Sequence, residues 1–493
     1  MLLRARAVLS ASLWIVCVAV FAVHVAAFVR STGLPIAGND FPAFYCAGEA
    51  LVARADPYAL EPLRSCEHQL PHGSDLPPQY VTPAPLPPYA LDLFALLAFL
   101  PYRLAAWLWF GALAGVCGWL AIAIARVTRV PSGVVACALL LSAALASAIF
   151  GQIPPIATLA IALCGAALLA GNDALAAVLA AAATIEPHVG LPAALSLFFF
   201  RPATRGWLIA CGLGAAAASL LAIGPQTSFG YLTSVLPEQA RAELVSSDQF
   251  SLAHVLTVLG LPDRLALLGG TASYLLMLVA GIIAAGIASR RLGVSALAYI
   301  PPAAVLLGGT FVHEIQLVAA LPAGFLLIAR GTPSAAWCGR LLVAAIAAVP
   351  FIVAGEQRPL TDVLAFFCAT GALVMTAPLD AVVEFPAALG SFVLAALCVA
   401  LPLAAQHLAP PISPSALSGA AAPAGGDAST NWGAYLRSDP RYAALRIDEE
   451  VAKIPSWLGL ASLLIAAFGM GALRVGLKPQ QRWDSRPGIQ LSP

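Results

Sequence analysis

The sequence predicts an all-α protein that crosses a membrane many times. Of its 493 residues, 60% are hydrophobic and only 10% are charged, whereas soluble domains carry about 25% charged residues. Apolar runs long enough for a transmembrane helix recur from end to end, and they give roughly 12–14 spans. The formal net charge of +1 argues neither for nor against a nucleic-acid partner, and no basic block occurs. We expect no nucleic-acid partner.

The first apolar run, residues 7–29, predicts the orientation of the N-terminus. Arg4 and Arg6 precede this run, and positively charged residues favour the cytoplasmic side of a membrane. The run is too long for a typical signal peptide, and no small-residue cleavage site follows it. We therefore expect an uncleaved first span that begins in the cytoplasm.

Short basic turns between later apolar runs carry the same signature. They lie at residues 201–205, 290–291 and 330–340, and the same charge rule assigns them to the cytoplasm. Two polar segments, residues 31–86 and 406–455, then fall on the opposite, non-cytoplasmic side. The topology is that of a multi-pass protein of the inner (plasma) membrane.

The polar stretch from Ala37 to Leu60 organises the first outer loop. It opens with Asp40, continues as a short amphipathic helix with Phe44 on its apolar side, and closes in a turn at Asp56-Pro57-Tyr58. A helix of this kind just outside a span tends to lie in the membrane interface. That placement would bring Asp40 within reach of a lipid head group; the plain alternative is a solvated loop acid.

The cysteines and histidines of the same loop raise two further questions. Eight of the ten cysteines lie in apolar runs, and only Cys46 and Cys66 lie in a polar loop. These two are able to form a disulfide if the loop faces an oxidising compartment. His68 and His72 have the spacing of metal ligands on a helix, but Pro71 breaks the helix between them. We expect no metal site.

Three polar groups interrupt the later apolar runs. They are Gln152 at the start of a run, Glu186-Pro187-His188 inside residues 173–200, and His313-Glu314 at the start of another run. Ionisable residues within a membrane are costly and mark cavities or functional sites. The alternatives are structural: Gln152 bonded to a neighbouring helix, Glu186 and His188 bonded to each other, and His313 as a packing residue.

These landmarks together resemble glycosyltransferase family 87. The matching residues are Asp40, Phe44-Tyr45, Ala47-Gly48 and Asp56-Pro57-Tyr58 in the first loop, then Pro87-Pro88, Gly151-Gln152, the polar run 246–252 and His313. The resemblance covers most of residues 35–330. It implies a membrane enzyme of the GT-C type that takes mannose, or a related sugar, from a polyprenyl-phosphate donor.

The resemblance also implies roles for individual residues. Asp40 matches the general base of the family. His313, His188 and Arg54 are, in that order, the candidates to bind the donor phosphate. The remaining residues expected to bind the donor phosphate or sugar are Tyr45, Gln152, Glu186 and Glu314. Two positions depart from the family pattern: Pro154 replaces an Asn, and Glu186 replaces a Lys that would serve the phosphate.

The implied chemistry is a single displacement. A polyprenyl phosphate is a good leaving group, so the enzyme needs mainly a base for the acceptor hydroxyl and positive groups or dipoles for the departing phosphate. The product would have inverted configuration. The outer loops contain neither a glycine-rich phosphate loop nor an Asp-x-Asp motif, which argues against a nucleotide sugar held through a metal. We expect no cofactor.

The sequence therefore predicts three parts. Residues 1–405 form the transmembrane catalytic domain, residues 406–455 a partly disordered outer insertion, and residues 456–493 the last span and a cytoplasmic tail. The expected partners are a polyprenyl-phosphate sugar, a glycolipid or glycan acceptor, and membrane lipids. A secondary transporter or lipid-linked-sugar flippase is the alternative, because helices broken by proline at ionisable residues also occur in transporters.

Overall fold

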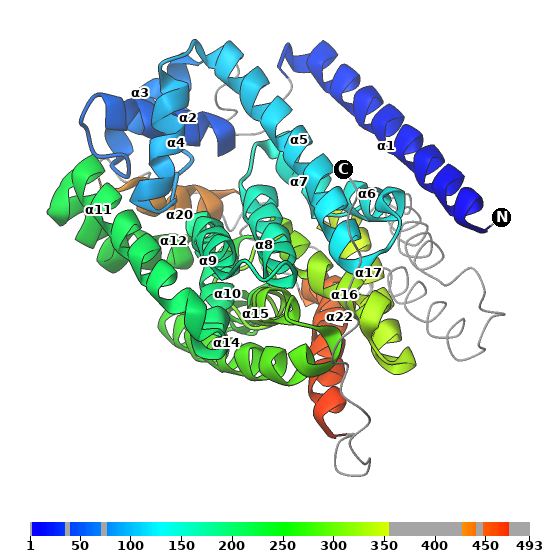
Figure 1. The fold of residues 1–493 in the computed structure, drawn as a ribbon. Helices are drawn as coiled ribbons and strands as arrows, with labels where there is room; N and C mark the ends of the chain where they lie inside the picture. Colours follow the sequence, from blue (N-terminus) through cyan, green and yellow to red (C-terminus); the bar gives the residue numbers. More distant parts are fainter. Residues whose placement is uncertain (1, 35–39, 71–75, 354–425, 440–446, 473–493) are drawn as a thin grey trace.

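The protein is all-α in a computed structural model that describes residues 2–34, 40–70, 76–353, 426–439 and 447–472. Within these ranges there are two isolated β-bridges and no strand. Figure 1 shows a bundle of helices of very unequal length, with α1 along one side. The prediction of an all-α membrane protein is confirmed.

The N-terminal third builds one long helix, a group of short helices and a second long helix. Its elements are α1 (Leu2–Thr32), α2 (Asp40–Val52), α3 (Leu60–Gln69), α4 (Pro88–Ala98) and α5 (Tyr102–Thr128). The short helix α2 packs closely against α4 and α3. The predicted helix of the first outer loop is therefore present, although it lies against protein, and nine of its thirteen residues are buried.

The middle of the chain consists mostly of helices too short to cross a bilayer. They are α6 (Ser132–Leu140), α7 (Ala143–Phe150), α8 (Pro154–Leu169), α9 (Asp173–Ala182), η1 (Ala183–Ile185), α10 (Pro187–Phe200) and η2 (Pro202–Thr204). Helices α6 and α7 meet at an angle of 64°. A bilayer core needs about 20 helical residues, so none of these helices is long enough to cross it alone.

Longer helices follow. They are α11 (Arg205–Gly230), η3 (Tyr231–Val235), α12 (Leu236–Ala242), η4 (Glu243–Val245), α13 (Leu252–Val258), α14 (Asp263–Leu292), α15 (Ala296–Val305), η5 (Glu314–Ala320), α16 (Leu321–Arg330) and α17 (Pro333–Val353). The C-terminal part contributes α20 (Ala428–Ser438) and α22 (Ile447–Ala472). Ser251 caps α13 by accepting a hydrogen bond from the backbone N–H of His254, which satisfies one free donor of that helix.

Fewer helices are long enough to cross a membrane than the sequence predicts. Among the described residues, four helical stretches have the required length and apolarity: 102–128, 202–245, 263–292 and 450–471. Counting the bent pair α6–α7 gives five. The difference from the expected 12–14 arises because several apolar runs are broken by proline or by loops; the runs expected at 360–378 and 385–405 lie outside the described residues.

Basic residues gather at one end of the bundle. Arg330, the last residue of α16, donates from Nη1 to the carbonyl of Leu292 at 3.0 Å and from Nη2 to the carbonyl of Val127 at 2.7 Å. These carbonyls belong to the last turns of α14 and α5. We call this the basic end. Its composition fits the cytoplasmic assignment of the basic turns.

Helices α9 and α10 form a hairpin that starts and finishes near the basic end. Ser295, next to α14, donates to the carbonyl of Gly165 in the second half of α8 at 2.9 Å. Arg201 after α10 pairs with Asp173 at the start of α9 at 2.6 Å. The apex of the hairpin, at Glu186, therefore points toward the opposite end of the molecule.

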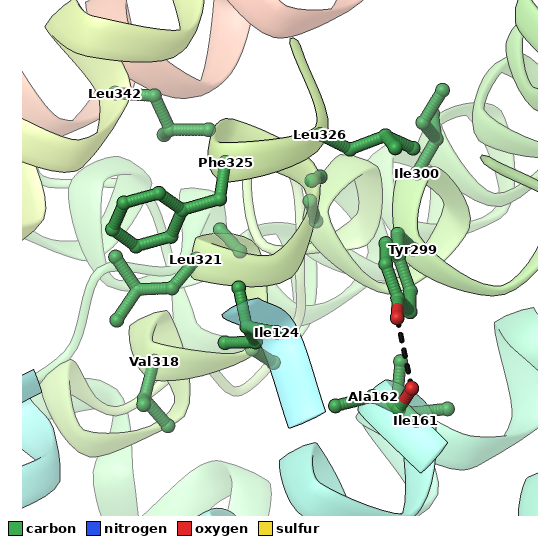
Figure 2. Packing of buried hydrophobic residues seen from close by; sticks show 14 of the residues in the cluster. Ile124, Ile161, Ala162, Tyr299, Ile300, Val318, Leu321, Phe325, Leu326 and Leu342 are labelled. Carbon is green, nitrogen blue, oxygen red and sulfur yellow. Dashed lines mark hydrogen bonds between the residues drawn. The ribbon is translucent and has the colours of Figure 1, made fainter. Parts of the chain in front are cut away.

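The main apolar core lies between these helices. Figure 2 shows part of it, where Phe325 and Leu321 of α16 pack near Ile124 of α5. Tyr299 is fully buried, and its hydroxyl donates to the carbonyl of Ala162 at 2.8 Å. This bond satisfies the one polar group of the ring inside the core and fixes α15 against α8.

Candidate functional site

A cavity of about 530 Å³ lies at the end of the bundle opposite the basic end. Helix ends and loops form most of its wall, and the central parts of the long spans do not line it. Its ionisable and amide-bearing lining residues are Asp40, Gln152, Glu186, His188, Gln239, Glu243, Asp248, His313, Glu314 and Gln316. Sequence segments far apart in the chain thus present most of the predicted polar residues to one space.

Asp40 is the first residue of α2, and two contacts fix that helix. Gly48 lies so close to α4 that an added Cβ would come within 2.4 Å of the backbone of Phe94. A disulfide joins Cys46 of α2 to Cys66 of α3. The pair that the sequence left open is therefore bonded, and α2 holds Asp40 at the cavity wall.

The cavity makes Asp40 a weaker acid than usual. Burial raises the pKa of Asp40 to about 6, while hydrogen bonding to Gln152 and the charge of His313 act in the opposite direction. At neutral pH the carboxylate is mostly ionised yet basic enough to accept a proton. These are the properties that a general base needs.

His313 is a cation in the same cavity. Its Nε2 lies 3.4 Å from Oε2 of Glu243. Burial alone would lower the pKa of an imidazole, but mainly the Glu243 carboxylate raises the pKa of His313 to about 9. The imidazole is therefore protonated at neutral pH.

Two loop segments clamp His313 in position. The backbone N–H of Phe250 donates to the carbonyl of Val312 at 2.6 Å, and Oε1 of Gln249 accepts from the N–H of Val312 at 2.9 Å. The N–H of Glu314 bonds the carbonyl of Asp248 at 3.1 Å. The polar run 246–252 and the segment 310–316 thus form one unit, which presents Asp248, His313 and Glu314 together.

Glu186 lies at the apex of the α9–α10 hairpin. Pro187 occupies the first position of α10, where a missing N–H costs nothing. Gly190 lets the two arms approach, because an added Cβ would lie 2.2 Å from the backbone nitrogen of Thr184. Oε1 of Glu186 accepts from Nε2 of Gln316 at 2.9 Å.

His188 has different neighbours from Glu186. Its ring stacks on Phe311, with the ring centroids 6.0 Å apart, and meets the edge of Tyr274 at 5.7 Å. The alternative in which Glu186 and His188 satisfy each other is therefore not the arrangement in the structure. Both side chains line the cavity that also contains Asp40.

Two of the predicted site residues do not line this cavity. The hydroxyl of Tyr45 donates to the carbonyl of Leu100 at 2.8 Å, within the packing of α2. Arg54 follows the end of α2 in a left-handed turn with φ of 56°, and it is exposed. The N-terminus of α2 lies at the cavity, so Arg54 lies beyond the opposite end of this helix.

Several cavity residues were not predicted as site residues. Gln239, Glu243 and Asp248 come from α12 and the polar segment that follows it. Thr82 lies in the first outer loop before Pro87-Pro88, and Trp432 lies in α20. Asp248 was recognisable as part of the polar run 246–252. The others carried no local signal, since their approach to Asp40 depends on tertiary packing alone.

The described lining residues offer acids but few cations. None of them is Lys or Arg, so His313 and His188 are the basic side chains of the cavity wall. No group of three His, Cys, Asp or Glu side chains in the described residues has metal-binding geometry. A bound phosphate would therefore depend on His313 and on backbone and amide dipoles.

Comparison with known proteins identifies the class. The model of glycosyltransferase family 87 matches residues 86–319 of the chain, a range that contains Gln152, Glu186, His188, Glu243 and His313. The match covers just under half of the chain and supports membership of this family, and with it a multi-pass membrane glycosyltransferase. No curated protein and no solved structure matches the chain significantly.

Proposed function

We propose that the enzyme transfers a hexose, with mannose as the first candidate, from a polyprenyl-phosphate donor to a glycolipid or glycan acceptor. The transfer takes place by inversion, in the manner of GT-C enzymes, on the non-cytoplasmic side of the plasma membrane. One observation carries the proposal: Asp40 and His313 share a cavity at the end of the bundle opposite the basic end. A base and a cation beside one space suit attack by a hydroxyl and departure of a phosphate.

An apolar groove beside the cavity supports a polyprenyl donor. It has a volume of about 610 Å³ and lies between α4, α9, α10 and α11. Exposed side chains of Leu93, Leu191 and Ile209 form part of its wall, so it opens toward the surface that faces lipid. Ile185 lines both the groove and the cavity. An isoprenoid chain in the groove would place its phosphate near Glu186 and His313.

Each step of the proposed transfer has a residue of the cavity beside it. Asp40 accepts the proton of the acceptor hydroxyl as its oxygen bonds the anomeric carbon. The bond from that carbon to the phosphate oxygen breaks on the opposite face, and the configuration inverts. Protonated His313 stabilises the negative charge of the departing polyprenyl phosphate. Gln152 orients Asp40 by hydrogen bonding to its carboxylate.

Two carboxylic acids lie close to the proposed position of the donor phosphate. Glu186 and Glu314 both line the cavity, and a carboxylate repels a phosphate unless it is protonated or neutralised by a cation. Burial and the neighbouring Asp248 raise the pKa of Glu314 to about 8. Glu314 is thus mostly neutral at pH 7, which reduces the repulsion that a phosphate would meet beside His313.

A transfer assay tests the proposal directly. The full-length protein in lipid nanodiscs is incubated with labelled polyprenyl-phosphate mannose and a panel of glycolipid acceptors, with guanosine-diphosphate mannose as the competing donor. We expect transfer from the polyprenyl donor only, and a product of inverted anomeric configuration by NMR. Transfer from the nucleotide sugar, or from neither donor across the panel, would contradict the proposal.

A further inference from the structure

One wall of the cavity contains buried polar atoms without partners. Gln239 is 6% exposed and Thr82 is 5% exposed, and both line the cavity. Within the described part of the chain, Oε1 of Gln239 and Oγ1 of Thr82 have no hydrogen-bond partner. A buried polar atom without a partner costs free energy, so both atoms are suited to a ligand that fills the cavity.

An aromatic ring completes this wall. Trp432 of α20 is half-buried and lines the same cavity. Its Nε1 donates to Oε1 of Glu243 at 2.8 Å, and Nε2 of Gln239 donates to the same oxygen at 3.0 Å. The carboxylate of Glu243 therefore fixes the indole and the amide relative to each other, and it leaves Oε1 of Gln239 without a protein partner.

Helix α20 is held firmly enough to carry a binding residue. The backbone N–H of Ala428 donates to the carbonyl of Tyr58 at 2.9 Å. The side chain of Asn431, which is fully buried, accepts from the N–H of Val81 at 2.9 Å and donates to the carbonyl of Gln79 at 3.0 Å. Figure 1 shows α20 beside α12 and below the α2–α4 group.

We propose that Trp432, Gln239 and Thr82 form a subsite for a sugar ring of the acceptor. The flat indole ring can pack against the C–H face of a sugar, while the free amide oxygen and the hydroxyl can bond the hydroxyl groups of the sugar. No Lys or Arg in the described lining accompanies these three residues, so they suit a neutral ligand better than a phosphate or a carboxylate. This inference rests on the proposed transfer reaction, whose acceptor it specifies as a carbohydrate.

The position of the wall favours the acceptor over the donor. The lining residues of the apolar groove belong to α4, α9, α10, α11 and the short segments between them, and none of them belongs to α12 or α20. A donor held by its chain in that groove would therefore reach the cavity from the side of α9 and α10, and not from the side of α12 and α20. Glu243 connects the two substrates, because its Oε1 binds Trp432 and its Oε2 faces His313.

Four variants of the full-length protein in nanodiscs test the subsite. Trp432→Ala removes the ring, Gln239→Leu removes the free oxygen, and Trp432→Phe keeps a ring but loses the N–H. Tyr435→Phe is the matched control on the same helix, because Tyr435 does not line the cavity and Phe keeps the ring that packs against Trp432 and Tyr80. Thermal unfolding checks that each variant folds.

The first measurement is binding without any reaction. Saturation-transfer NMR follows methyl α-mannoside, methyl α-glucoside, methyl α-galactoside and α-mannobiose, with glycerol as a probe that has no ring. We expect at least one sugar to bind, and Trp432→Ala and Gln239→Leu to weaken it by about tenfold. Tyr435→Phe should bind as the wild type does. The subsite would be overturned if Trp432→Ala and Gln239→Leu both fold and bind the sugar as the wild type does. It would also be overturned if the wild type binds none of the sugars.

The second measurement separates this inference from the proposed function. With polyprenyl-phosphate mannose as donor, the two cavity variants should raise the acceptor KM by a larger factor than the donor KM. A raised donor KM with an unchanged acceptor KM would overturn the acceptor assignment. Sugar binding that depends on Trp432 without transfer from any donor would instead support the subsite and contradict the proposed function.

Discussion

Oε1 of Glu186, at the apex of the α9–α10 hairpin, accepts a hydrogen bond of 2.9 Å from Nε2 of Gln316 in η5. The bond joins two segments that are far apart in sequence, and both side chains line the cavity. It gives a buried carboxylate a neutral donor in place of a cation. Glu186, which replaces a Lys of the family pattern, thus has a hydrogen-bond partner inside the site.

This pair predicts how substitutions at Glu186 affect stability. Glu186→Leu leaves the buried amide of Gln316 without its acceptor, which should lower the free energy of unfolding by about 1–3 kcal/mol. Glu186→Gln keeps an acceptor oxygen and should cost less. Thermal unfolding in nanodiscs measures both. The double variant Glu186→Leu/Gln316→Leu should recover part of the lost stability. If Glu186→Gln and Glu186→Leu destabilise the protein equally, the hydrogen bond to Gln316 does not contribute to stability.

The proposed base makes a separate prediction about turnover. Asp40→Asn keeps the size of the side chain and can still contact Gln152, but it cannot accept the proton of the acceptor. A general base contributes about 10²–10⁴ in rate, so transfer should fall by that factor while folding and donor binding stay nearly intact. Single-turnover transfer and donor affinity are measured in parallel.

The matched control for this variant is Asp92→Asn. Asp92 lies on α4, is half-buried, and does not line the cavity, so its amide variant should transfer at the wild-type rate. If Asp40→Asn retains more than about a tenth of wild-type transfer, Asp40 is not the base. Glu186 would then be the next carboxylate to substitute.

The two perturbed groups also predict the pH dependence of transfer. Asp40 acts as a base only when it is ionised, and its pKa is about 6, so the rate should rise with pH through that value. His313 stabilises the leaving phosphate only when it is protonated, and its pKa is about 9, so the rate should fall above it. The measured profile of kcat/KM should rise near pH 6 and fall on the alkaline side, where the ionisation of Glu314 near pH 8 precedes the loss of the His313 proton.

Substitution of His313 tests the alkaline limb of that profile. His313→Gln keeps a polar side chain of similar size but carries no charge. We expect a lower rate, a higher donor KM and the loss of the fall near pH 9, while the acidic limb near pH 6 remains. An alkaline limb that persists in His313→Gln would assign that titration to another group.

Features of this protein that depend on local sequence signals could be predicted, whereas features that depend on long-range packing could not. The fold class and the grouping of Asp40, Gln152, Glu186, His188 and His313 around one cavity could be predicted, because apolar runs and polar breaks within them are local signals. The number of full spans could not be predicted. Whether an apolar run crosses the membrane or turns back depends on where its helix breaks, as at Glu186-Pro187, and on what packs around the break.

The arrangement of the site also depends on long-range packing. Arg54 was predicted as a ligand of the donor phosphate because of its charge, and the structure places it beyond the end of α2 opposite to Asp40. Trp432 was visible only as an aromatic residue in the outer insertion. Its contact with Glu243 depends on α20 docking between the first loop and α12, and no local pattern predicts such docking.

The last prediction concerns the side of the membrane on which the cavity lies. The hydrogen bonds from Ala428 to Tyr58 and from Asn431 to Gln79 attach α20 to the first loop, so both segments must lie on one side. The contacts of Arg330 place the turn after α14 at the other end. The basic turns favour the cytoplasm, which leaves the cavity facing outward.

Cysteine labelling in intact cells measures this arrangement. Gln69→Cys and Arg437→Cys place thiols at exposed positions of α3 and α20, and Arg291→Cys places one at an exposed position of the basic end. A membrane-impermeant maleimide should label the first two directly, and the third only after permeabilisation, with the unsubstituted protein as the blank. Labelling of Arg291→Cys in intact cells, with protection of the other two, would invert the topology and place transfer on the cytoplasmic side. Labelling of only one of Gln69→Cys and Arg437→Cys would contradict the docking of α20 on the first loop.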